Sequence, residues 1–218
     1  MRSVDSSLII LKSRYLDAER TGREWDLKDT RVHVLLYFIS PYGHGLKPLD
    51  LEVMGKLSTK VNIVPIIAKS DSLTKAEIMT LKARILKELG AAGIRIYQLP
   101  NVDSNEDEEY KDQVDQLRSY VPYTVCGANA LVEVRGKKIR ARQYPWGTVE
   151  VENPDHCDFV KLRLMLVTHM EGLQYVTHHL HHQTYAANAA LQPFQRKAEE
   201  MKKRRESNKS NFNNNFFM

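Results

Sequence analysis

The chain has 218 residues, of which 42% are hydrophobic, and a formal net charge of +5. This apolar content suffices for the core of one globular domain and excludes a chain that is disordered throughout. Residues 193–218 hold seven Lys or Arg against three Glu, which is +4 of the charge, so the body is nearly neutral and lacks the broad basic field of a nucleic-acid-binding protein.

The cysteine content and the N-terminal residues indicate the cellular compartment of the protein. Cys126 and Cys157 are too few for a disulfide framework and lack the spacing of a metal site, so we expect an intracellular, reducing environment. The apolar run from Leu8 to Leu11 has four residues, too short for the core of a signal peptide or for a membrane span. The sequence therefore predicts a cytoplasmic protein.

The first half of the chain alternates strand and helix patterns. Val32–Ile39 and Val61–Ile67 are apolar runs rich in β-forming residues, typical of strands that are buried on both faces. A short helix is predicted between them, over 49–57. Pro65 removes one donor from the second strand.

The next predicted helix begins after Thr74, which has capping-box spacing to Glu77, and ends at Gly90. Ile94–Tyr97 is then predicted as a third strand and Tyr123–Cys126 as a fourth, with a helix between them. This alternation predicts parallel strands joined by helical crossovers, and hence an α/β layered sheet.

From Leu131 the pattern changes to alternation with period two around Gly136. Such a pattern predicts an antiparallel hairpin, to which "TVEVEN" adds a third strand, so the element covers 131–152. A long amphipathic helix is predicted from 158. Residues 191–218 are charged and then rich in asparagine, and we expect them to be disordered.

Two clusters near the C-terminus have alternative interpretations. His178 and His182 are spaced i, i+4 on a helix and could bind a metal, but no neighbouring carboxylate or cysteine completes a set, so a polar helix face or a partner contact is favoured. The basic run Lys202–Arg205 is compatible with a contact to anionic lipid, whereas the glutamates beside it favour a solvated tail.

The most informative residues follow the second apolar strand. Lys69 and Asp71 lie at the carboxyl edge of the predicted sheet, where ligands of open α/β sheets bind. An ionised aspartate presents two acceptor oxygens that match the two adjacent N–H donors of guanine, and a lysine stem can lie along the base. The plain alternative is that both residues occupy a turn and that Asp71 helps to begin the next helix.

Two long segments, "DTRVHVLLYFISPYGHGLKPLDLEVMGKLSTKVNIVPIIAKSDSLT" and "GKKIRARQYPWGTVEVENPDHCDF", closely resemble the septins, the filament-forming GTP-binding proteins. The resemblance runs from about Tyr15 to about Thr184. It implies a three-layer sheet like that of P-loop GTPases without its N-terminal strands, with a lead-in at 1–28 and the C-terminal part of a septin-type G domain at 29–190.

The resemblance also implies roles for particular residues. Lys69 and Asp71 match the guanine-reading A-K-x-D motif, Gly127 matches the glycine of the next base-contacting loop, and Arg142 matches the arginine that packs over the base. Septins usually have serine where this chain has Ala128.

Three further residues are implied to act between subunits. His44 would approach the phosphates of a neighbour's nucleotide, Glu77 its ribose, and Trp146 would lie in the nucleotide-side interface with other septins. The alternatives are a turn residue for His44, a helix cap for Glu77 and a core aromatic for Trp146.

The sequence contains no phosphate loop of the form G-x-x-x-x-G-K-[ST] and no D-x-x-G motif. We therefore expect no catalytic residues and no Mg²⁺ ligands here, weak binding of GTP or GDP, and no unaided hydrolysis. The favoured function is a subunit of hetero-oligomeric septin filaments, a cytoskeletal scaffold in cytokinesis and cell division, in which terminal helices and a coiled coil also contribute. The alternatives are a truncated septin that modulates the assembly of longer ones, and an active GTPase.

Overall fold

The computed structural model describes residues 2–21, 29–101, 107–134, 136–195 and 200–201. Some sequence-based predictions fall outside these residues, namely those for the basic run at 202–205, most of the tail at 191–218 and Arg135 in the hairpin turn.

Three parallel strands form the main sheet, in the order β1-β2-β3. They are β1 (Val34–Ile39), β2 (Asn62–Ala68) and β3 (Tyr123–Val125). β1 pairs with β2 over the full length of β1, and β2 pairs with β3 from Ile66 onward. The parallel layered sheet that the alternation predicts is confirmed.

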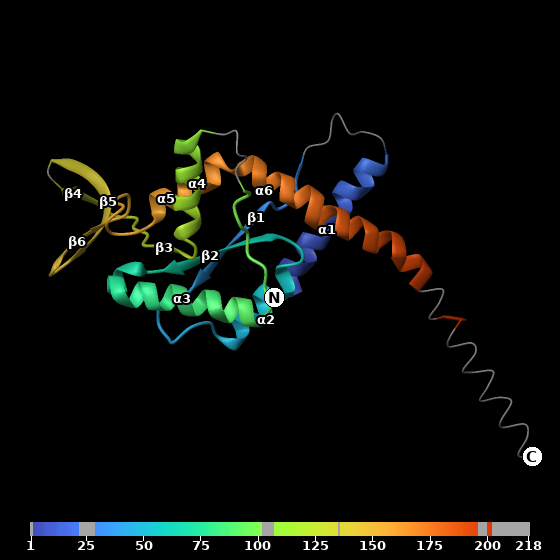
Figure 1. Cartoon of the computed structure of the whole chain (residues 1–218), viewed down its shortest axis with the longest axis horizontal. Coiled ribbons are helices and arrows are strands. Elements are labelled where there is room, and N and C mark those ends of the chain that lie inside the picture. The colour runs from blue at the N-terminus through green and yellow to red at the C-terminus, as the bar shows by residue number, and fades with distance from the viewer. Residues whose placement is uncertain (1, 22–28, 102–106, 135, 196–199, 202–218) are drawn as a thin grey trace, which may run out of the picture.

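Helices cover both faces of this sheet (Figure 1). They are α2 (Pro48–Leu57) and α3 (Lys75–Ala91) on one face, and α4 (Glu108–Ser119), α5 (Phe159–Thr168) and α6 (Met170–Val176) on the other. Successive residues of a strand point to opposite faces. Accordingly, Ile63 and Ile67 pack against α2 and α3, whereas Val64 and Ile66 pack against α4, α5 and α6. The result is three layers.

A second, antiparallel sheet consists of β4 (Leu131–Val134), β5 (Lys137–Tyr144) and β6 (Gly147–Glu150). Gly136 has a φ of 74°, as the tight turn between β4 and β5 requires. Tyr144 pairs with Gly147, so Pro145 and Trp146 form the loop between β5 and β6. The sheet stands at the end of the molecule opposite the C-terminal helix (Figure 1).

The lead-in is helical over α1 (Arg2–Arg20). Leu8 joins the core cluster on the α2–α3 face of the main sheet. At the other end of α1, Glu19 Oε2 lies 2.8 Å from His182 Nε2. This contact ties α1 to the π-helical turn η3 (Thr177–His182), after which residues 183–195 continue as helix.

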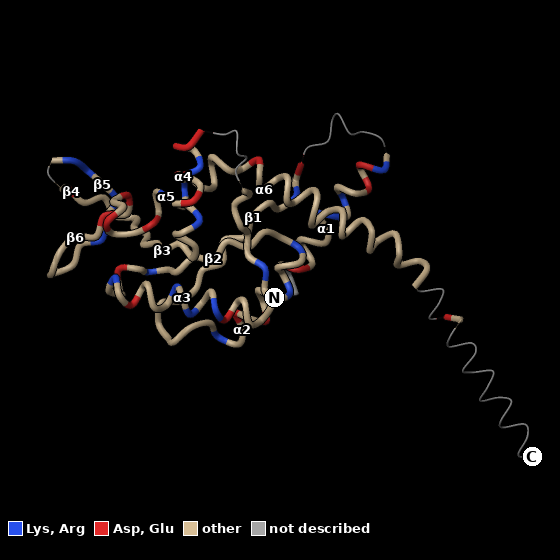
Figure 2. The backbone as a smooth tube through the Cα atoms, viewed as in Figure 1, with Lys and Arg blue, Asp and Glu red and all other residues tan. Residues whose placement is uncertain are grey.

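Charges of both signs occur along α1, α2, α3 and α4, whereas the described helix at 183–195 carries none (Figure 2). Glu108 and Glu109 begin α4, where negative charge is favourable at the positive end of the helix dipole. On α4 the apolar residues Val114 and Leu117 are buried.

The prediction of a strand over Ile94–Tyr97 is wrong. Tyr97 N–H donates to Ile63 O at 2.8 Å, which is the first bond of a parallel ladder with β2. The next ladder bond would come from the N–H of residue 65, and Pro65 has none. The segment therefore lies beside β2 without forming a strand.

The predicted end of α3 is also wrong, because the helix continues through Gly90 to Ala91. Gly93, with a φ of 64°, ends it. Gly93 N–H donates to Gly90 O at 3.1 Å and Ile94 N–H to Leu89 O at 3.0 Å, which is the Schellman pattern. At the other end, Thr74 and Glu77 form the capping box that the spacing predicts.

The long helix predicted from 158 is divided at His169 into α5 and α6, although its apolar stripe remains continuous. Leu162, Met165 and Leu173 are all buried in one cluster. Neither proline nor glycine occupies position 169, so nothing in the residue pattern marks the break.

The two glycines near the end of α3 give a matched pair of substitutions. Gly93→Ala is expected to destabilise the chain by about 1–2 kcal/mol, since alanine is strained at positive φ. Gly90→Ala is expected to stabilise it by about 0.5–1 kcal/mol, because a Cβ there meets nothing within 4 Å and alanine favours helix interiors. Urea unfolding of both variants measures the difference; equal effects would contradict the assignment of the helix end.

Candidate guanine-recognition site

β2 ends in a sharp turn. Lys69 adopts the left-handed conformation, with φ 52° and ψ 46°, and the 3₁₀ turn η2 (Ser70–Ser72) follows it. Ser72 holds the turn, because its backbone N–H and its Oγ both donate to Lys69 O, at 3.1 and 2.8 Å. The left-handed conformation strains a non-glycine residue by about 1–2 kcal/mol. The turn leaves Lys69 exposed and directs Asp71 inward.

The Asp71 carboxylate receives donors from β5. Arg142 Nη1 lies 3.1 Å from Asp71 Oδ1 and 2.9 Å from Oδ2, and the Tyr144 hydroxyl donates to Oδ2. The side chain of Asp71 is only 3% exposed, whereas that of Arg142 is 32% exposed. The guanidinium therefore covers the carboxylate on its solvent side.

Arg142 also contacts the loop that follows β3, where its Nε donates to Gly127 O at 2.7 Å. One side chain thus joins the turn after β2, the loop after β3 and the small sheet. Asp71, Gly127 and Arg142, which the sequence places far apart, meet at the carboxyl edge of the main sheet.

The contacts fix the charge of the pair. Burial alone would raise the pKa of Asp71, but the hydrogen bonds from Tyr144 and Arg142 outweigh it and lower that pKa below 3.8. Burial would lower the pKa of Arg142, and its bond to Asp71 raises it instead. The pKa of Tyr144 is raised, first of all by its bond to Asp71. At neutral pH the site holds a carboxylate and a guanidinium.

This arrangement can bind a planar base that carries adjacent N–H donors. A carboxylate has about four lone-pair positions, so Asp71 can accept further donors beside Tyr144. The guanidinium of Arg142 is planar and stacks well on aromatic rings once it leaves the carboxylate.

The other predicted residues lie around this cluster. Lys69 Nζ lies 5.7 Å from the ring centroid of Tyr42, a cation–π contact that ties the turn to the loop after β1. His44, in the same loop, is exposed, and its backbone oxygen accepts from Arg84 Nη1 at 2.5 Å. Glu77 is exposed at the start of α3.

The structure bears on the alternatives for these residues. Glu77 Oε2 accepts from Thr74 N at 2.8 Å, so Glu77 does cap the helix. Trp146 is 70% exposed and stacks on Tyr144 at 4.8 Å, so it is not a core aromatic. Asp71 does not begin α3, because Thr74 is its N-cap.

Sequence reasoning missed Tyr144 and Ser70. Tyr144 follows Arg142 by two positions on β5, and this period places both side chains on one face, a signal that was available. Ser70 Oγ is buried and has no hydrogen-bond partner among the described residues. No sequence pattern marks it.

The histidine cluster packs against the start of β2 and the segment before β1. His181 Nε2 lies 3.0 Å from Asn62 Oδ1, and Arg31 Nη1 lies 3.2 Å from His178 Nδ1. Within the described ranges, no group of three or more His, Cys, Asp or Glu side chains could hold a metal ion. Nor is any described helix both long and apolar enough to cross a membrane.

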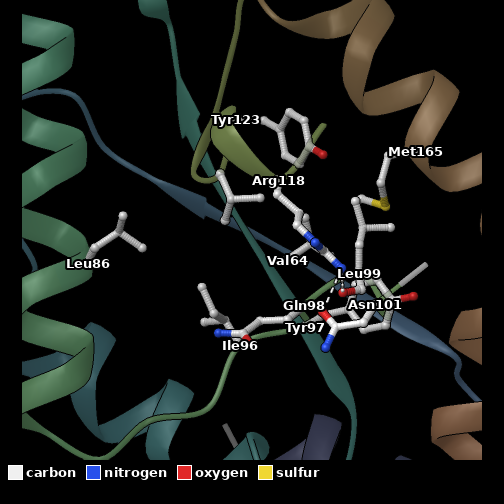
Figure 3. A pocket seen from close by; sticks show the side chains of 11 residues that line it. Val64, Leu86, Ile96, Tyr97, Gln98, Leu99, Asn101, Arg118, Tyr123 and Met165 are labelled. Carbon is white, nitrogen blue, oxygen red and sulfur yellow. Dashed lines mark hydrogen bonds between the residues drawn. The ribbon is translucent and has the colours of Figure 1, made fainter. Parts of the chain in front are cut away.

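A separate cavity of about 430 Å³ lies beneath the segment at 96–101 (Figure 3). Val64, Leu86 and Met165 contribute apolar surface, and Arg118 enters from α4. The cavity reaches Tyr123 at the start of β3, whereas Asp71 and Gly127 follow the carboxyl ends of β2 and β3. It is therefore separate from the candidate base-recognition cluster.

Fold and site together define a three-layer α/β domain with an arginine-covered carboxylate at its carboxyl edge. A family model described as "Septin" matches residues 8–200. The chain belongs to the septin family.

Individual relatives agree with this assignment. The chain is 56% identical over 194 residues to "Septin-1" of Drosophila melanogaster, covering 89% of this chain and 54% of the relative. It is 55% identical over 172 residues to "Septin-2B" of Xenopus tropicalis, covering 79% of this chain and 48% of the relative. The chain thus spans about half the length of these curated relatives.

A solved structure supports the fold. The "Crystal structure of Septin GTPase domain from Chlamydomonas reinhardtii" superposes with a TM-score of 0.67 at 22% sequence identity, covering 85% of this chain and 68% of that one. The parallel sheet, the antiparallel sheet and the flanking helices therefore have the fold of a septin GTPase domain.

The charge state of Asp71 predicts a pH-dependent contribution to stability. At pH 7 the wild type is expected to exceed Asp71→Asn by about 1–2 kcal/mol in unfolding free energy, because the ionised carboxylate accepts charged hydrogen bonds. Since its folded pKa is lowered from 3.8, this advantage is present above pH 3.8 and is lost as the pH falls through the folded value.

Urea unfolding between pH 7 and pH 3 measures this effect. Asp115→Asn is the control, because Asp115 forms a surface pair with Arg118 and its side chain is 69% exposed. An advantage over Asp71→Asn that persists unchanged at acid pH would contradict the ionised pair.

Proposed function

We propose that this chain is a septin-type subunit that recognises the guanine base of GTP or GDP through Asp71, within a domain at 29–190. The observation that carries the proposal is the ionised, inward-facing Asp71 with Arg142 and Gly127 beside it at the carboxyl edge of the sheet. Open α/β sheets bind ligands at this edge. Membership in the septin family supports the same assignment.

Base binding would proceed by exchange of partners. Arg142 leaves the solvent side of Asp71 and stacks on the base, and the two N–H donors of guanine take its place on the carboxylate. Adenine offers an acceptor where guanine offers the ring N–H and would leave a buried carboxylate oxygen unmatched. Gly127 O and the Lys69 stem border the base.

The phosphates would be bound less well. These 218 residues contain no G-x-x-x-x-G-K-[ST] loop and no D-x-x-G motif, which supply the phosphate and Mg²⁺ contacts in P-loop NTPases. We therefore propose weak binding of guanine nucleotides by this polypeptide, without unaided hydrolysis.

Two residues would serve a neighbouring subunit. His44 is exposed on a loop flanked by Gly43 and Gly45, so its imidazole is accessible to the phosphates of a partner's nucleotide. Glu77 caps α3 through Oε2, and its Oε1 accepts no hydrogen bond within the described part of the chain, which leaves it available to a ribose hydroxyl.

Assembly would use the nucleotide-side face. Trp146 stacks on Tyr144, which donates to Asp71, so an exposed aromatic surface adjoins the base site. Exposed aromatics are typical anchors of protein interfaces. We propose that this surface and the terminal helices join other septins in cytoskeletal filaments that act as scaffolds in cytokinesis. In a second version of the same role, the chain modulates the assembly of longer septins.

Nucleotide titration tests the base site. Calorimetry is expected to give dissociation constants weaker than micromolar, similar values for guanosine, GDP and GTP, and no measurable binding of ADP. Asp71→Asn should abolish the preference for guanine, whereas Asp115→Asn should keep it. Micromolar or tighter binding of GTP, far stronger than that of guanosine, would contradict a site limited to the base.

Trp146→Ala tests the assembly surface. Because Trp146 is 70% exposed, the variant should change the unfolding free energy by no more than about 0.5 kcal/mol. It should nevertheless lose association with a full-length septin in analytical ultracentrifugation. Met79→Ala removes an equally exposed side chain from α3 and should retain association. Equal association of both variants with the partner would argue against this face.

A further inference from the structure

The loop at 40–47, between β1 and α2, is fastened to α3 by two hydrogen bonds. Glu88 Oε2 accepts the backbone N–H of Leu46 at 2.7 Å, and Arg84 Nη1 donates to the backbone oxygen of His44 at 2.5 Å. Glu88 follows Arg84 by four positions in α3, so both side chains extend from the same side of the helix. These two bonds are called the α3 clamp below.

The clamp depends on a glycine. Gly45, between the two bonded residues, has a φ of 141°, which residues with a side chain rarely adopt. A Cβ on Gly45 would also come closer than 3.0 Å to both carboxylate oxygens of Glu88. Gly43 has a similar φ of 130°, but a Cβ there would meet nothing within 4 Å. The Glu88 carboxylate therefore occupies the space that a side chain at position 45 would fill.

The clamp restricts the backbone of the loop and leaves His44 accessible. Arg84 binds the backbone oxygen of His44 rather than its imidazole, and His44 is exposed. On the other side of His44, Tyr42 contacts Lys69, whose Nζ lies 5.7 Å from the ring centroid. His44 thus lies between two anchored residues, Tyr42 and Leu46. A loop that is ordered before it meets a partner loses less conformational entropy on binding.

We propose that Glu88 and Arg84 are positioning residues, which hold the loop in the conformation that presents His44 to a neighbouring subunit. This inference rests on the role proposed above for His44, whereas the clamp itself involves this chain alone. Without the clamp, the loop would have to become ordered during association, and the loss of entropy would weaken the binding of the partner.

Two alternatives make different predictions. In the first, the clamp serves only to hold α3 in the fold. Leu81, Ile85 and Leu89 already bury α3 in the core cluster, so loss of the clamp should change the stability of the whole chain little. In the second, Glu88 acts on the partner through its charge. The isosteric Glu88→Gln then removes the effect, although its amide oxygen can still accept the Leu46 N–H.

Hydrogen exchange of the Leu46 amide, followed by NMR on the full 218-residue chain, tests the clamp. In the wild type this amide should exchange slowly although it belongs to a loop. Glu88→Ala should speed its exchange by about tenfold or more, since a hydrogen bond to a charged group contributes that much. Glu88→Gln should keep most of the protection. Exchange as fast in the wild type as in Glu88→Ala would overturn the proposal.

The two glycines of the loop supply a matched pair of variants. Gly45→Ala should release the Leu46 amide as Glu88→Ala does, because the new methyl group displaces the carboxylate. Gly43→Ala has a similar unfavourable φ without that collision, so the Leu46 amide should stay protected. Equal exchange rates of Leu46 in the two glycine variants would contradict the contact between Gly45 and Glu88.

Association with a full-length septin, measured by analytical ultracentrifugation, tests the positioning role. Glu88→Ala and Gly45→Ala should associate several-fold more weakly than the wild type, whereas Glu88→Gln should retain association. Urea unfolding of Glu88→Ala should remain close to that of the wild type, because the core packing of α3 is unchanged. A variant whose Leu46 amide is released but which associates as tightly as the wild type would overturn the positioning role.

The two measurements separate this inference from the proposed function. If the wild type itself does not associate with a septin, the proposed assembly fails and the positioning role fails with it. The exchange of the Leu46 amide still decides whether the clamp exists, because that measurement needs neither a partner nor a nucleotide.

Discussion

The ion pair between Asp71 and Arg142 holds the two sheets of this molecule in a fixed relation. Asp71 belongs to the turn after β2, Arg142 to β5, and the guanidinium reaches both the carboxylate at 2.9 Å and Gly127 O at 2.7 Å. A charge-assisted bond of this kind is costly to break from one side, because the partner would be left buried and unpaired. The small sheet therefore depends on the carboxylate that is also the candidate base-recognition group.

A second carboxylate, that of Asp158, forms another joint at the main sheet. Asp158 Oδ2 accepts from Lys82 Nζ and from Thr124 N, each at 2.9 Å, and so joins α3, β3 and the start of α5. The side chains of Lys82 and Asp158 are 15% and 11% exposed. This joint leaves Asp71 out, so it holds α3, β3 and the start of α5 together independently of the ion pair.

Much of this arrangement follows from local pattern. Alternating strand and helix patterns predicted the parallel sheet, the spacing of Thr74 and Glu77 predicted the capping box, and alternation with period two predicted the antiparallel sheet around Gly136. Each of these depends on neighbours in the sequence. The wrong prediction of a strand, by contrast, depends on a distant partner. Whether Ile94–Tyr97 becomes a strand is decided by the missing donor of Pro65, on another element.

The candidate site likewise combines a residue whose position could be predicted from local sequence with residues whose positions could not. The position of Asp71 at the sheet edge could be inferred from the strand that precedes it, whereas the family resemblance was needed to connect Arg142 with it. Tyr144 escaped notice because its partner lies on the other sheet. The burial of Cys126 and Cys157 in one cluster had no sequence signal at all, since it results from the packing of α5 along β3.

The stacking of Trp146 on Tyr144 also has an optical consequence. Indole emission responds to the polarity and motion of its surroundings, and this indole touches the phenol whose hydroxyl engages Asp71. The chain has two tryptophans, Trp25 and Trp146, so a single replacement of Trp25 leaves one emitter. Rearrangement at the carboxylate thereby becomes visible through fluorescence native to the polypeptide, without any attached dye.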